Sequence, residues 1–182
     1  GEMRDWIVEP VGDGNILSGV EKGLYELTHY KLIKNSPKVL AVQAEGSAAI
    51  FNAFKQNKPI TKISSTTLAD SISVDLPRDG DAAVRAIKRS GGDAITVSDA
   101  EILLAMKELA SLSGVFSEPA AATAYAGFIK ALDRIIKRDR KVLILLTGSG
   151  LKDIDSAFKS VDVNEIVKIE PDLKQLKKHI GG

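Results

Sequence analysis

Four residues near the start of the chain have the types and spacing of an anion-binding turn: Gly12, Asp13, Gly14 and Asn15. They follow a short apolar run and precede a segment with helical periodicity. Glycine lets the backbone approach a ligand closely, and the first N–H groups of a helix have no partner within that helix. The helix dipole also favours a negative charge there. An ordinary strand-to-helix turn can have the same sequence, so the loop alone leaves both interpretations open.

Composition narrows the chemistry available to the chain. The 182 residues include no cysteine and two distant histidines, His29 and His179, so we expect no disulfide, no metal site and no cysteine nucleophile. The 25 Lys and Arg residues balance 24 Asp and Glu residues, which argues against nucleic-acid binding driven by bulk charge. Hydrophobic residues make up 44% of the chain, an ordinary content for a soluble globular protein.

Targeting signals are also missing from the sequence. No apolar run approaches the length of a membrane span, and residues 1–4 contain no signal-peptide core. We therefore expect a cytoplasmic protein with no membrane partner.

Strand and helix patterns alternate along the chain. The expected strands cover residues 5–9, 38–45, 94–97, 142–146 and 165–169. The expected helices cover residues 15–32, 47–54, 81–89 and 119–138, with two more beginning after Ser98 and near Pro171. This alternation predicts an α/β fold, with an open, largely parallel sheet and helices on both faces, in one domain over residues 1–182.

Several local patterns make sharper predictions. Ser98 and Glu101 have the spacing of a capping box, and residues 142–146 have the composition of a fully buried strand. Residues 57–77 form a long polar connection, a kind of loop that is often functional. The buried face of the first helix is predicted to contain Ile16, Val20, Leu24 and Leu27.

Ligands of such sheets bind beyond the carboxyl ends of the strands. Two of the expected strand ends carry Gly-rich turns, at Gly12 and at residues 147–150, and a third carries the isolated carboxylate Glu45. These turns are therefore the first candidates for a binding site.

Five motifs in order resemble the threonine synthases, which are pyridoxal-phosphate enzymes of fold type II. The motifs are P-V-G-D-G-N from Pro10, V-Q-A-E-G from Val42, T-L-A-D-S-I from Thr67, G-V-F-S-E-P-A from Gly114 and L-T-G-S-G-L-K-D from Leu146. The similarity runs over residues 5–153, and the T-G-S-G-L-K-D run is its strongest part.

The resemblance implies pyridoxal phosphate as the cofactor. Gly12, Asp13, Gly14 and Asn15 correspond to the loop that binds the cofactor phosphate through backbone N–H groups. Thr147 corresponds to the hydroxyl residue at the pyridine nitrogen, and a neutral partner there leaves that nitrogen largely unprotonated.

Three carboxylates fall in the other matching motifs. Glu45, Asp70 and Glu118 correspond to positions around the cofactor, and we expect them as possible lining of the site. Each has a plainer interpretation as a solvated carboxylate or, for Glu118, as the start of a helix before Pro119.

Members of the family carry their Schiff-base lysine ahead of the phosphate loop, in a Ser-Phe-Lys context. Lys55 and Lys159 have similar neighbours but follow that loop, so we interpret both as exposed helix lysines. The resemblance therefore implies a C-terminal portion comprising most of the large cofactor domain. The small substrate domain and the catalytic lysine are expected to be absent, and the segment alone is expected to be inactive.

By resemblance, the parent enzyme is a lyase of threonine biosynthesis that converts O-phosphohomoserine and water to threonine and phosphate. Its substrate is a small amino acid, and a homodimeric parent is compatible with the family. Two alternatives stay open: a related enzyme such as cysteate synthase or threonine dehydratase, and a non-catalytic anion- or nucleotide-binding module. The G-D-G-N and L-K-D details favour the threonine synthases over the dehydratases.

Overall fold

The computed structural model describes residues 3–161 and 168–180. Its sheet has four strands in the order β3-β2-β1-β4, and every neighbouring pair is parallel. The strands are β1 (Trp6–Pro10), β2 (Lys38–Ala44), β3 (Asp93–Val97) and β4 (Val142–Ile144). The predicted α/β fold with a parallel sheet is confirmed.

Seven α-helices and three short 3-10 helices lie in the described residues. The α-helices are α1 (Asn15–His29), α2 (Ala49–Gln56), α3 (Gly80–Ser90), α4 (Asp99–Ser113), α5 (Pro119–Ala131), α6 (Ile154–Lys159) and α7 (Leu173–Ile180). The 3-10 helices are η1 (Glu45–Ser47), η2 (Asp70–Ile72) and η3 (Gly150–Lys152). No described helix has both the length and the apolar character needed to cross a membrane.

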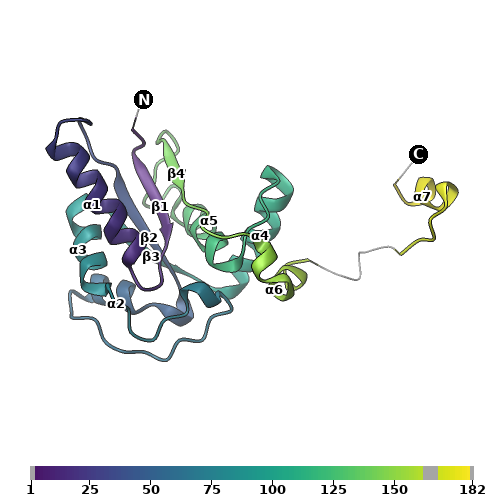
Figure 1. Cartoon of the computed structure of the whole chain (residues 1–182), viewed down its shortest axis with the longest axis horizontal. Coiled ribbons are helices and arrows are strands. Elements are labelled where there is room, and N and C mark those ends of the chain that lie inside the picture. The colour runs from purple at the N-terminus through teal and green to yellow at the C-terminus, as the bar shows by residue number, and fades with distance from the viewer. Residues whose placement is uncertain (1–2, 162–167, 181–182) are drawn as a thin grey trace.

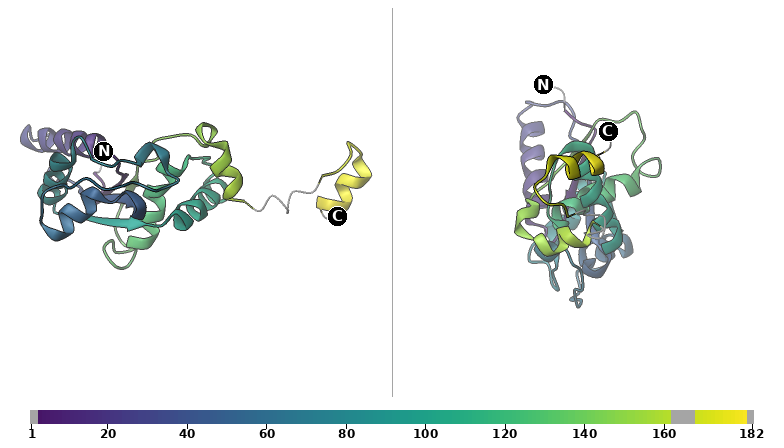
Figure 2. Two further views of the ribbon diagram at one scale, coloured as in Figure 1. Left: turned by 90° about the horizontal axis from the view of Figure 1, so that it is seen from below. Right: turned by 90° about the vertical axis from the view of Figure 1, so that its right-hand side faces the viewer.

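The helices form a layer on each face of the sheet (Figure 1). Helices α1, α2 and α3 cover one face, where Val39 and Ala41 pack against Leu17 and Ile87. Helix α5 packs on the other face and α4 packs on α5. The left-hand view in Figure 2 shows the molecule from below, along these layers. The two apolar clusters therefore bury the sheet from both sides, as near-continuous apolar strands require.

Local signals explain where α3 ends and where α4 begins. Ser98 Oγ accepts a hydrogen bond from Glu101 N at 3.2 Å, and Glu101 Oε2 accepts one from Ser98 N at 2.6 Å, so the predicted capping box is confirmed. Gly91 ends α3 in a left-handed conformation with φ 65°, which glycine adopts without strain.

Helix α5 ends seven residues before the predicted position. Leu132 is extended and Asp133 has φ 65°, so the chain turns instead of continuing the helix. Asp133 N then donates to Ile136 O at 2.8 Å, and Ile136 is buried by this turn. Apolar residues continue at helical spacing beyond Ala131, and for this reason the periodicity predicted a helix longer than α5.

The buried face of α1 is rotated from the predicted one. Leu17, Glu21 and Leu24 are buried, whereas Ile16 is 53% exposed. Glu21 faces inward because its carboxylate pairs with Arg89 of α3 at 3.2 Å. The sequence pattern predicted an apolar contact on this face of α1, but the structure has an ion pair with α3 there.

Strand β4 is shorter and more exposed than predicted. Leu143 is 43% exposed, because β4 pairs with β1 on one side and lies at the sheet edge in the described part of the chain. The strand expected at 165–169 falls mainly on residues 165–167, which lie outside the described residues. The expected terminal helix is present as α7, and all its residues are exposed.

Candidate functional site

A cavity of about 320 Å³ lies at the carboxyl ends of β1 and β4. Its walls come from the turn after β1, from η2, from the first turn of α5 and from the turn after β4. The chain leaves β1 toward β2 on one side and returns to β4 on the other, so the connections diverge at this point. Parallel sheets bind ligands where their connections diverge in this way.

Unpaired backbone N–H groups dominate one wall of the cavity. Within the described residues, no oxygen accepts a hydrogen bond from the six N–H groups of residues 12–17, and these six residues all line the cavity. Helix α1 has no capping side chain and no acidic residue in its first turn. The helix dipole is therefore uncompensated here, and an anion is the ligand that would satisfy these groups.

Both glycines of this loop are required by the way it packs. A Cβ on Gly12 would lie 2.9 Å from Ile72 Cα, and one on Gly14, where φ is 93°, would lie 2.9 Å from Ala83 Cβ. Asp13 fixes the loop from the same side, since its Oδ1 accepts a hydrogen bond from Arg78 N at 3.0 Å. The loop is thus held from behind, with its N–H groups left for the cavity.

Glu118 is the charged group buried in the cavity wall. Its side chain is 7% exposed, and Lys152 Nζ lies 3.0 Å from its Oε2. Ser71 Oγ donates to the same oxygen at 3.4 Å. The carboxylate also fills the space beside Gly148, where a Cβ would lie 2.0 Å from Glu118 Oε1. Glu118 therefore links η2, the start of α5 and the turn after β4.

Thr147 lines the cavity directly after β4. Its hydroxyl forms no hydrogen bond with another residue in the described ranges. Capping of the following 3-10 helix is performed by Ser149 instead, whose Oγ accepts from Leu151 N at 3.3 Å. Thr147 therefore does not cap that helix, and its hydroxyl is available to a ligand.

The structure brings six of the expected residues to one cavity and leaves two outside it. Gly12, Asp13, Gly14, Asn15, Glu118 and Thr147 line it. Glu45 instead pairs with Lys130 at 3.5 Å, and Asp70 is exposed outside the lining. Ser71 and Ile72 occupy the wall next to Asp70. The T-L-A-D-S-I motif had indicated the segment, but it could not indicate which side chain turns inward.

Neither of the two candidate lysines lines this cavity. Lys55 is in α2, where it pairs with Asp93 at 2.5 Å, and Lys159 is at the end of α6. Both are exposed, which confirms that they are helix lysines.

We expect replacement of Lys152 by Met to destabilise the fold by about 1–2 kcal/mol, because Glu118 would keep a buried charge without its cation. This loss of stability is smaller than that expected for a fully buried ion pair, because the Lys152 side chain is 61% exposed. Urea unfolding of K152M, E118Q and the double variant measures it, with K177M on the exposed face of α7 as control. Additive effects of the two single changes would contradict the proposed coupling.

The chain belongs to the family of pyridoxal-phosphate dependent enzymes, whose sequence profile matches residues 1–148. The expected cofactor is thereby confirmed as that of the family. Curated relatives that it matches include threonine synthases, so the resemblance seen in the sequence is also confirmed.

Two archaeal relatives show the extent of the match. The threonine synthase of Methanocaldococcus jannaschii is 38% identical over 180 residues, which cover 97% of this chain and 44% of that protein. The threonine synthase of Methanosarcina acetivorans is 40% identical over 155 residues, covering 84% of this chain and 38% of that protein. The chain thus spans less than half the length of these relatives.

Solved structures show the same fold. Threonine synthase from Escherichia coli matches with a TM-score of 0.68 and 20% identity, over 96% of this chain and 39% of that one. A fungal L-serine ammonia-lyase from Rhizomucor miehei matches with a TM-score of 0.69 and 24% identity, over 87% of this chain and 50% of that one. At these identities the likeness concerns the fold alone.

Proposed function

We propose that this chain forms the cofactor-binding part of a threonine synthase, which converts O-phosphohomoserine and water to threonine and phosphate. The row of unpaired N–H groups over residues 12–17 carries the proposal, because it provides a phosphate site in a family defined by a phosphorylated cofactor. The cavity volume also lies within the range of small-molecule sites, about 300–1,000 Å³. The residues present therefore fit pyridoxal phosphate.

Each wall of the cavity then has a role. Gly12, Asp13, Gly14 and Asn15 bind the phosphate through their backbone N–H groups. Thr147 places its hydroxyl at the pyridine nitrogen, and this uncharged partner keeps the nitrogen largely unprotonated. Glu118, held by Lys152, fixes the turn that carries Thr147. When bound, the cofactor supplies an electron sink for reactions at the carbon atoms of the substrate.

The same proposal covers the organisation of the enzyme. Residues 1–182 form a single α/β domain that is most of the large domain, and the small substrate domain and Schiff-base lysine lie outside this segment. Lys55 and Lys159 support this division, since both lie on helices away from the cavity lining. The segment alone is then inactive. The complete enzyme acts in the cytoplasm on an amino-acid substrate, and a homodimer is the assembly we propose for it.

Replacing Gly12 with alanine tests the phosphate site. We expect G12A to weaken binding of pyridoxal phosphate by about tenfold or more, because the added methyl group displaces the loop from Ile72 and misaligns its N–H groups. G19A is the matched control, since a Cβ at Gly19 meets no atom within 4 Å. Fluorescence titration measures both, and equal binding of pyridoxal without phosphate would contradict the assignment.

Borohydride reduction tests whether the Schiff-base lysine lies outside this segment. Saturable binding of pyridoxal phosphate without a specific reduced lysine is the result we expect from the proposed division of the enzyme. Stoichiometric labelling of one residue, such as Lys159 or Lys55, on peptide mapping would show instead that the catalytic lysine is in this chain.

A further inference from the structure

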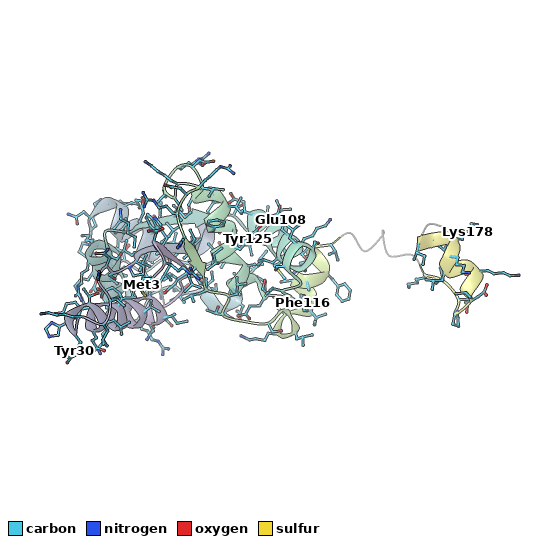
Figure 3. The ribbon with its side chains drawn as sticks, turned by 90° about the horizontal axis from the view of Figure 1, so that it is seen from above. Met3, Tyr30, Glu108, Phe116, Tyr125 and Lys178 are labelled. Carbon is cyan, nitrogen blue, oxygen red and sulfur yellow. The ribbon has the colours of Figure 1, made fainter. Side chains whose placement is uncertain are left out.

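A second cavity, of about 850 Å³, lies at the opposite edge of the sheet, where the strands begin. Its walls come from residues 3–6, from residues 32–38 between α1 and β2, and from residues 135–141 before β4. Figure 1 shows these three segments together at the upper edge, and Met3 on the wall is labelled in Figure 3. This cavity shares no residue with the proposed cofactor site.

Basic side chains are concentrated in this second cavity. Among the described residues, six Lys and Arg residues line it but a single Asp or Glu residue does. The basic residues are Arg4, Lys34, Lys38, Lys137, Arg140 and Lys141. The near-neutral charge of the whole chain therefore hides a strongly positive region at one edge of the sheet.

Asp5, the lining carboxylate within residues 3–161 and 168–180, is already engaged. Asp5 Oδ2 accepts a hydrogen bond from Lys141 N at 2.8 Å, and its Oδ1 lies 3.9 Å from Arg140 Nη1. By contrast, Arg4, Lys34 and Lys137 have no ion-pair partner in the described part of the chain. These three cations come from three different segments, so local sequence does not explain why they meet.

Compensation of helix dipoles is the plainer explanation for cations at this edge, because α1 and α5 end here. Helix α1 ends at His29 and α5 at Ala131. The dipole acts mainly within the last turn of a helix. Lys34 and Lys137 lie more than one turn beyond these ends, so the dipoles do not account for them.

We propose that this second cavity binds a small molecule with several phosphate groups, of the class of nucleoside diphosphates and triphosphates. Lys and Arg are the side chains that bind phosphate most strongly, and several phosphates can engage cations from all three segments at once. Met3 and Leu32, which is 71% exposed, add an apolar part of the wall for the nucleoside. The volume is also in the range of small-molecule sites.

Titration calorimetry with ATP, tripolyphosphate and AMP at constant ionic strength tests this proposal. We expect saturable binding of ATP and tripolyphosphate, and binding of AMP weaker by about tenfold or more. The double variant K34E/K137E should lose about tenfold or more of the ATP affinity. The matched control K174E/K177E places the same charge change on α7, away from the cavity, and should bind ATP as the unchanged chain does.

Three results would overturn the proposal. Failure of ATP to bind saturably would show that the cavity does not take this class of ligand. An equal loss of ATP affinity in both double variants would show an effect of net charge alone. Tighter binding of single-stranded RNA than of ATP, with strong salt dependence, would identify a nucleic-acid surface instead. Titration of K34E/K137E with pyridoxal phosphate shows that the variant is folded, and it separates this proposal from that of the cofactor site.

Discussion

Replacing Gly127 with alanine should destabilise the protein by about 2–3 kcal/mol, a large share of the roughly 5–15 kcal/mol that holds a typical domain together. Gly127 of α5 lies directly against Val42 of β2. A Cβ there would lie 2.3 Å from Val42 Cγ2, 2.5 Å from Cγ1 and 2.9 Å from Cβ. Val42 is fully buried in β2, so rotating its side chain does not remove the overlap.

Urea unfolding measures this effect, with a glycine in an open position as control. A Cβ at Gly23 in α1 meets no atom within 4 Å, so G23A should stabilise the protein by about 0.5–1 kcal/mol through helix propensity. The double variant G127A/V42A should lose less stability than the sum of its single changes, because shortening Val42 makes room. A neutral G127A would show that α5 does not approach the sheet as described.

Glu9 should make the protein less stable as pH rises from about 4.5 to about 7. Its side chain is fully buried in the central strand, and neither carboxylate oxygen has a partner in the described residues. Burial raises the pKa of Glu9 from 4.5 to about 7. The folded state therefore binds a proton that the unfolded chain releases at lower pH, and stability falls by about 3 kcal/mol across this range.

The variant E9Q should remove this part of the pH dependence, since an amide does not ionise. We expect E9Q to match the unchanged chain near pH 4 and to exceed its stability by about 3 kcal/mol at pH 8. Thermal unfolding at several pH values measures the difference, with E26Q on the exposed side of α1 as control. An identical pH profile for E9Q and the unchanged chain would show that Glu9 is solvated or paired.

Most of the secondary structure was predictable because its signals are local. The capping box at Ser98 marks the start of α4, and Gly91 marks the end of α3. The end of α5 was not predictable from periodicity, because Ile135 and Ile136 continue the apolar series through a turn. The exposure of β4 depends on which strands flank it, and no pattern within the strand reports that.

In the candidate site too, some features could be predicted from local sequence and others depend on the tertiary structure. Glycines at 12 and 14 report a backbone requirement, so a tight turn at this place in the cavity wall could be predicted from the residues themselves. The pairing of Glu118 with Lys152 depends on where β4 ends relative to α5, which is tertiary information. The second cavity could be predicted even less from the sequence, since its residues Arg4, Lys34 and Lys137 are separated by long stretches of chain.

The place of β1 in the sheet affects how the chain is made. Of the four described strands, β1 is synthesised before the others, but it lies inside the sheet, and its partners are residues 38–44 and 142–144. At a synthesis rate of about 5–20 residues per second, β4 follows β1 by on the order of ten seconds. One edge of β1 offers unpaired N–H and C=O groups during this interval. This sheet is therefore incomplete, and open to misfolding or to a chaperone, until residue 144 has left the ribosome.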